Sequence, residues 1–94
     1  VPYSVHIAKG EPFTAADIRA MLKPHPEGGY VLITVNIDNA VLSAETRFEQ
    51  PLKSVQPLFE NRPPLELEEG QASFLDHYEP FDTHVFRIEL KSDP

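Results

Sequence analysis

The sequence contains no cysteine and no tryptophan, and only four of its 94 residues are glycine. Without cysteine the chain can form no disulfide, no thiolate metal site and no cysteine nucleophile. Eight lysines and arginines lie scattered among fifteen aspartates and glutamates. Nucleic acid is therefore not an expected partner, because phosphate binding needs clustered cations. A membrane is not an expected partner either, since no apolar run approaches the roughly 20 residues of a spanning helix.

Proline, in contrast, is abundant: there are ten, spread along the chain. Proline is excluded from helix interiors and from central strands, so long helices have little room, whereas short strands fit between the prolines. The length, with 40% hydrophobic and 24% charged residues, is typical of one soluble globular domain covering residues 1–94. The chain begins at Val1 without an initiating methionine or a signal-peptide pattern, so we expect a piece of a larger protein.

The strongest strand signal is Tyr30–Ile37, which is rich in β-branched residues and follows the turn signal Gly28-Gly29. Its apolar residues fall on both faces, with Val31, Ile33 and Val35 on one and Tyr30, Leu32 and Thr34 on the other. A sandwich needs only one buried face. We expect the second face to look outward, with Leu32 partly exposed, and to form a domain interface composed of Tyr30, Leu32 and Thr34.

Other segments alternate in the same way. Thr83–Leu90 places His84, Phe86, Ile88 and Leu90 on one face, which we expect to be buried. Ser43–Phe48 is expected to turn Glu45 and Arg47 outward. Weaker strand candidates are Tyr3–Ala8, Val55–Phe59, Leu65–Glu68 and Gln71–Leu75, with Gly70 as a hairpin turn between the last two.

The segment Phe13–Lys23 fits two structures. Thr14 to Asp17 could cap a helix through Ile18 and Leu22. Ile18, Ala20 and Leu22 also alternate with Arg19, Met21 and Lys23, as in a strand. We favour the strand, joined to Tyr30–Ile37 by a hairpin. Seven or eight short strands at a spacing of about ten residues then predict an all-β fold, a small antiparallel β-sandwich of Greek-key type.

Three segments resemble a known family: Gly29–Asn36, Val55–Arg62 and Phe74–Ile88. Together they are similar to the C-terminal β-sandwich that follows the (β/α)8 barrel in many bacterial glycoside hydrolases. The third segment is the most specific, because it matches the family pattern in register at Pro80, Phe81, His84, Val85, Phe86 and Arg87. The chain departs from the family at Asn61, often glycine, and at Thr83, often valine, which leaves the subfamily undecided.

The resemblance implies a non-catalytic accessory domain that packs against the catalytic barrel of its parent chain and stabilises it. It implies no catalytic residue, no cofactor and no enzymatic activity in this chain alone, and it favours a secreted or periplasmic parent. One alternative is a carbohydrate-binding module, with Tyr3, Tyr30 and Tyr78 as candidate sugar contacts. Another is an immunoglobulin- or fibronectin-like domain that binds protein through an edge strand.

Histidines and carboxylates give no catalytic or metal pattern. No two of His6, His25, His77 and His84 have the spacing of a common zinc site, so no metal is expected. His84 is expected to bond a backbone carbonyl or a carboxylate. Asp76, Glu79 and Asp82 could hold a structural calcium, or Asp76 and Asp82 could accept backbone N–H groups of the turn. The run Glu66, Glu68 and Glu69 is typical of a solvated face.

Overall fold

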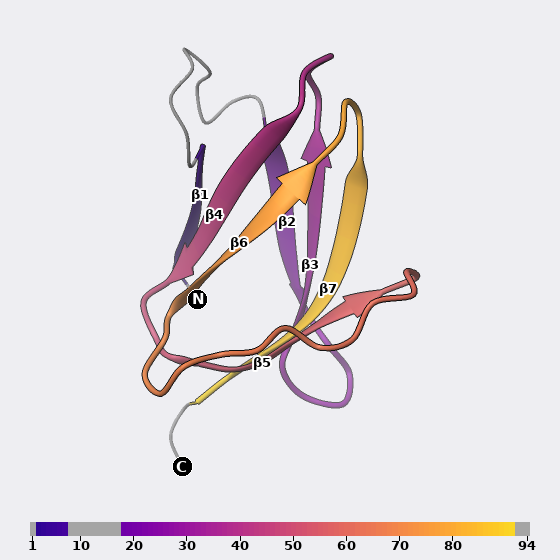
Figure 1. Cartoon of the computed structure of the whole chain (residues 1–94). Coiled ribbons are helices and arrows are strands. Elements are labelled where there is room, and N and C mark those ends of the chain that lie inside the picture. Colours follow the sequence, from indigo (N-terminus) through magenta and orange to yellow (C-terminus); the bar gives the residue numbers. More distant parts are fainter. Residues whose placement is uncertain (1, 8–17, 92–94) are drawn as a thin grey trace.

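The computed structural model describes residues 2–7 and 18–91, which contain seven β-strands and no helix. Two antiparallel sheets pack face to face, one with the strand order β1-β4-β6 and the other with the order β2-β3-β7-β5 (Figure 1). The strands are β1 (Tyr3–Ile7), β2 (Ile18–Pro24), β3 (Tyr30–Asn36), β4 (Leu42–Phe48), β5 (Leu52–Leu58), β6 (Ser73–Tyr78) and β7 (Thr83–Leu90). The predicted small antiparallel β-sandwich is confirmed.

Only β2 and β3 are both consecutive in the chain and adjacent in a sheet, and the other consecutive strands alternate between the sheets. The β2–β3 register runs from the pair Ile18 and Asn36 to the pair Pro24 and Tyr30. Gly29 has a φ of 75°, and a Cβ there would lie 2.6 Å from the Ile88 carbonyl oxygen, so the turn needs glycine. The strand interpretation of 18–23 is therefore confirmed. The proposed helix cap at Thr14–Asp17 lies outside the described residues.

The prediction of a strand at Leu65–Glu68 is wrong, because this segment is extended but pairs with no strand along its length. Pro63 and Pro64 precede it and cannot donate to a ladder. Its one bond to a strand runs from the Leu65 N–H to the Val55 carbonyl, at 3.0 Å. Leu65 and Leu67 instead pack against the core, so the segment covers the sandwich as a loop.

The predicted facing of β3 is also wrong. Leu32 and Thr34 are fully buried, so neither can belong to an outward domain interface, and Tyr30 is half-buried against the core. The cause is the register with β7, which sets Leu32 opposite Phe86. Directly paired residues share one face of a sheet, and the face of Phe86 is the core. The outward residues of β3 are instead Val31, Ile33 and Val35.

The other predicted facings are confirmed. Phe86 and Ile88 are fully buried, and the β4 strand buries Leu42, Ala44, Thr46 and Phe48 while it turns Arg47 outward. Arg47 there forms an ion pair with Glu45 at 2.8 Å. The larger of two core clusters brings residues from both sheets together, namely Leu32, Phe48, Leu52, Val55, Phe74, Phe86 and Ile88.

Candidate functional site

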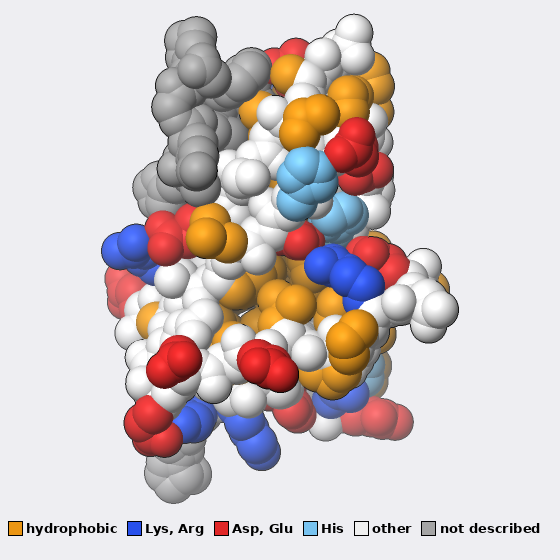
Figure 2. Space-filling model, viewed as in Figure 1, with side chains coloured by type: hydrophobic (Ala, Val, Ile, Leu, Met, Phe, Trp, Pro, Cys, Tyr) orange, Lys and Arg blue, Asp and Glu red, His pale blue; other side chains and the backbone are white. Residues whose placement is uncertain are grey.

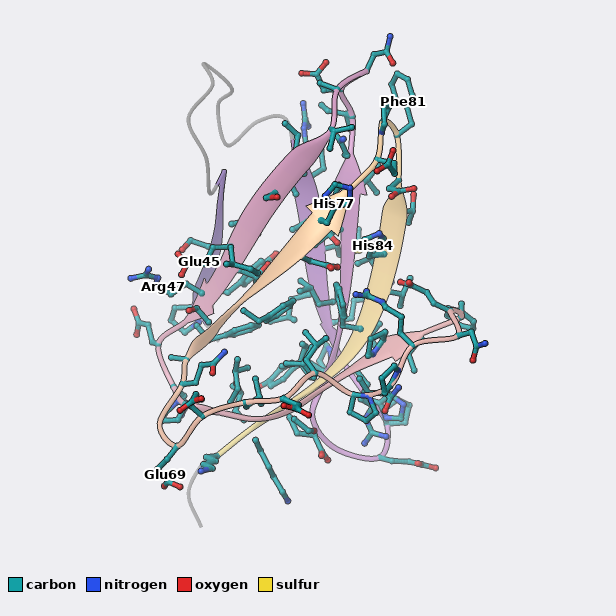
Figure 3. The ribbon with its side chains drawn as sticks, in the orientation of Figure 1. Glu45, Arg47, Glu69, His77, Phe81 and His84 are labelled. Atoms are coloured by element: carbon teal, nitrogen blue, oxygen red, sulfur yellow. The ribbon has the colours of Figure 1, made fainter. Side chains whose placement is uncertain are left out.

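A polar network joins β6, β7 and the loop that follows β5, and its centre is the carboxylate of Asp76. The Asp76 side chain is 8% exposed and lies 2.6 Å from Nδ1 of His84. Arg62 donates to both Asp76 oxygens, at 3.1 and 3.2 Å, in a bidentate pair. Its Nε donates to Glu60 at 3.0 Å. Figure 3 shows His84 on β7 directed toward β6, and the hydrogen bond to Asp76 spans the two sheets there.

Tyr78 extends this network into the core. Its ring stacks on the His84 ring with centroids 4.3 Å apart, and its hydroxyl lies 2.6 Å from the Thr34 Oγ1. Burial raises the pKa of Tyr78 well above its ordinary value, so the phenol stays protonated and serves as a hydrogen-bonding group. The ring is only 1% exposed, and the prediction that Tyr78 contacts sugar is therefore wrong.

The arrangement of Asp76 and His84 resembles the base-orienting half of a hydrolytic triad. Among the described residues, however, the polar partners of the His84 ring are carboxylates, Asp76 at 2.6 Å and Asp82 at 3.5 Å, and not a hydroxyl group. The expectation that His84 bonds a carboxylate is confirmed. What the network does is tie the 59–72 loop to the sandwich, because Arg62 comes from that loop.

The remaining histidines lie in separate surroundings. His25 accepts the Glu27 N–H within the β2–β3 turn, and His77 forms an exposed pair with Glu79. The side chain of His6 is outside the description. In Figure 2 histidine and acidic side chains lie close together on one face, yet no described group of three or more His, Asp or Glu is placed to hold a metal ion.

The second interpretation of the acidic cluster is confirmed for Asp82, which accepts a backbone N–H of the turn, whereas Asp76 accepts one within strand β6. Asp82 accepts from the Glu79 N–H at 2.8 Å, and Asp76 accepts from the His77 N–H at 3.0 Å. The bond from Glu79 to Asp82 lies in the turn between β6 and β7 and holds it.

We expect the substitution Asp76→Ala to lower the free energy of unfolding by about 2–4 kcal/mol. It leaves the Arg62 guanidinium and the His84 ring without their shared partner, and removing one member of a buried ion pair is strongly destabilising. Urea denaturation of the isolated chain measures the loss. The matched control is Glu79→Ala, whose side chain is 61% exposed and pairs only with exposed His77, and which should change stability by less than about 0.5 kcal/mol. A loss below about 1 kcal/mol for Asp76→Ala would show that the network contributes little.

The outer face of the four-stranded sheet carries an apolar row. The registers place Met21, Ile33, Val85 and Leu58 side by side across all four strands. Met21 is 51% exposed, and the other members are half-buried. Three cations lie on the same face in the neighbouring rows: Arg19, Lys23 and Arg87. We call this surface the outer sheet face. Solvent-facing sheet surfaces are ordinarily polar, so an apolar row on one indicates a contact surface.

Two further phenylalanines lie outside the core. Phe59 is 92% exposed and Phe81 is 62% exposed, and each has a φ of 62°. The left-handed conformation costs a bulky residue roughly 1–2 kcal/mol, and neither side chain recovers that cost by burial. Phe81 lies at the β6–β7 turn, where its N–H donates to the Asp38 carbonyl (Figure 3). The sequence pattern does not predict that these two phenylalanines are exposed, because phenylalanine is ordinarily a core residue.

Two of the three tyrosines predicted to contact sugar line grooves. Tyr30 lines an open groove of about 530 Å³, together with Pro24, Gln50, Lys53 and Glu89. Tyr3 lines a smaller groove of about 290 Å³ and stacks on Phe48, with ring centroids 5.9 Å apart. For Tyr3 and Tyr30, sugar contact stays a prediction.

Comparison with models of known protein families gives no match for this chain. Searches among curated proteins and among solved structures also find no match. Within residues 2–7 and 18–91 there is no helix of the length and hydropathy needed to cross a membrane. Functional inference therefore depends on the residues and on their geometry.

Proposed function

We propose that this chain is a non-catalytic accessory β-sandwich domain of a bacterial glycoside hydrolase, which packs against the catalytic (β/α)8 barrel and stabilises it. The three segments that resemble such domains support this proposal, because they meet in space. They include β3, β5 and β7, which are neighbours in one sheet. Arg62 of the second segment also bonds Asp76 of the third, and that carboxylate bonds His84 of the same segment.

The observation that carries the proposal is the outer sheet face. It has an apolar row across four strands, in which Met21 is 51% exposed and the other three members are half-buried. An interface between domains of one chain typically covers about 600–1,500 Å², which is the scale of a sheet face. Arg87 on this face pairs with Glu89 at 3.9 Å, so its charge is balanced within the sheet itself.

In this proposal the hydrolytic carboxylates belong to the barrel, at the C-terminal ends of its strands. The sandwich contributes by burying apolar surface on the barrel and by fixing the shape of the enzyme. The isolated chain should therefore give only background rates on aryl glycosides. The non-catalytic role would be contradicted if the isolated chain hydrolysed a glycoside and if replacing one glutamate or aspartate abolished that activity.

We expect Met21→Asp to weaken docking to the barrel by at least about tenfold while the isolated chain stays folded. Met21 is 51% exposed and lies in the middle of the edge strand β2, on its outer face. A carboxylate at this position therefore stays hydrated until the barrel covers it. Isothermal titration of the sandwich into the separately expressed barrel of its parent enzyme measures the affinity.

The matched control for Met21→Asp is Leu75→Asp, on the outer face of the other sheet. Leu75 is 62% exposed and lies on β6, which belongs to the three-stranded sheet. Leu75→Asp should leave the affinity unchanged. Equal losses from both variants, or no loss from either, would contradict docking through the outer sheet face. An absence of binding between the unsubstituted sandwich and barrel would contradict the proposed function itself.

A further inference from the structure

We propose that the groove beside the β2–β3 turn binds a neutral saccharide, a role that does not depend on docking to a barrel. The groove is lined by residues of the β2–β3 hairpin, the last residues of β7, the β4–β5 turn and the start of β5. Its volume is about 530 Å³, and it is open to solvent along one side. Such a groove can receive one or more sugar rings without a conformational change of the chain.

Tyr30 gives the groove a rigid apolar wall. Its backbone pairs with Ile88 on one side and with Pro24 on the other. The half-buried ring packs against the core, as does Leu90 beside it. The adjacent Gly29 packs so closely on β7 that it has no room for a Cβ. The wall formed by Tyr30 and Pro24 is therefore already in place before a ligand binds, and preorganisation of this kind lowers the entropic cost of binding.

The polar side of the groove has two exposed side chains that are available to a ligand. Lys53 and Gln50 line it, and within the described part of the chain neither side chain forms a hydrogen bond or an ion pair. Glu89 is oriented by the Ser54 hydroxyl, which donates to it at 2.9 Å. The groove therefore offers an ammonium, an amide and a fixed carboxylate along one apolar wall.

These groups determine the class of ligand. Arg87 donates to the Gly28 carbonyl at 2.9 Å and its Nη2 lies 3.9 Å from a Glu89 carboxylate oxygen, so the groove carries Lys53 and a Glu89 carboxylate that is paired with Arg87. A ligand with a single charge is attracted by one of Lys53 and Glu89 and repelled by the other, so the groove does not select for a charge of either sign. Hydroxyl groups can donate to the carboxylate and accept from the ammonium at the same time. A molecule with many hydroxyl groups and one apolar C–H face, such as a pyranose, fits both walls.

The second groove extends this inference to oligosaccharides. Glu49 lines the groove of Tyr3, and Gln50, the next residue, lines the groove of Tyr30. The two tyrosines thus flank one short turn between β4 and β5. A ligand of several sugar units that crosses this turn would contact both rings. We therefore expect an oligosaccharide to bind more tightly than the monosaccharide of the same kind.

The test is an NMR titration of the ¹⁵N-labelled chain with three neutral probes, maltohexaose, cellohexaose and xylohexaose, and with an acidic probe, a galacturonic acid hexamer. At least one neutral probe should shift the amide signals of Gly28, Gly29 and Lys53 at millimolar concentration. The double variant Lys53→Ala with Gln50→Ala should weaken that binding by at least about tenfold. Both residues are exposed, so this variant is expected to fold. Tyr30→Leu, which keeps an apolar side chain but loses the ring, should also weaken binding.

The matched control is Lys23→Ala, which removes a cation from the outer sheet face and should leave saccharide binding unchanged. The proposal is overturned if no neutral probe shifts these amides, if the double variant binds as well as the original chain, or if the acidic probe binds more tightly. Each of these results leaves docking through Met21 untouched, so the two proposals fail separately.

Discussion

Replacing Leu32 with aspartate is expected to leave the chain unfolded. The Leu32 side chain is fully buried, and it lies opposite Leu22 on one neighbouring strand and Phe86 on the other. Aspartate at this position would place an unpaired carboxylate in the core, which costs several kcal/mol in addition to the lost burial of leucine. A domain of this size is stable by only about 5–15 kcal/mol. Far-UV circular dichroism and urea denaturation measure the outcome.

The matched control is Ile33→Asp, one residue further along the same strand. Ile33 lies on the outer sheet face, opposite Met21 and Val85, so its carboxylate would remain in contact with water. The cost should be about 1 kcal/mol, mainly the poor fit of aspartate to a strand. If Leu32→Asp folds while Ile33→Asp does not, the facing of β3 described here is inverted.

Truncating Phe86 to alanine is expected to cost about 3–5 kcal/mol. The ring is fully buried and meets the Phe74 ring edge-on, with centroids 5.1 Å apart. The Arg62 guanidinium lies 5.9 Å from the centre of the same ring, so the cavity would also disturb the polar network. A domain of this size has a free energy of unfolding of about 5–15 kcal/mol, so this loss would remove a large part of its stability.

Phe59→Ala is the matched control for Phe86→Ala, because both variants remove the same side chain. Phe59 is 92% exposed, so its truncation should change the free energy of unfolding by less than about 0.5 kcal/mol. Urea denaturation monitored by near-UV circular dichroism compares the two. Similar losses for both variants, or a loss below about 1 kcal/mol for Phe86→Ala, would contradict the assignment of Phe86 to the core.

Residues from two of the three segments that resemble the family acquire a physical role in this structure. Arg62, Asp76 and His84 come from two separate segments, yet they form one hydrogen-bonded network around a nearly buried carboxylate. A buried charge must be paired, so a carboxylate at position 76 requires the hydrogen-bond donors at positions 62 and 84. The network therefore gives these three residues a structural role, which is to hold the loop after β5 and the two sheets together.

The class of the fold and the facing of several strands were determined by the sequence alone. Ten prolines excluded long helices, and alternation predicted short strands between them. The facing was predictable where one face is polar. In β4 the charged residues Glu45 and Arg47 had to face water, and in β7 Arg87 and Glu89 likewise left Phe86 and Ile88 for the core. Burying a charged side chain costs a large desolvation free energy, so charged residues face water. The alternation of charged and apolar residues along a strand is therefore enough to predict which face is buried.

Strand β3 shows what only the tertiary structure decided. Both of its faces are apolar, so the cost of burial does not distinguish them, and its facing was set by pairing with β7. Register depends on partners distant in the sequence, and a shift by one residue inverts every side chain of a strand. The same reason applies to the Asp76 network and to the grooves at Tyr30 and Tyr3. Each is formed by segments that meet only after the two sheets have packed, and no local pattern encodes such a meeting.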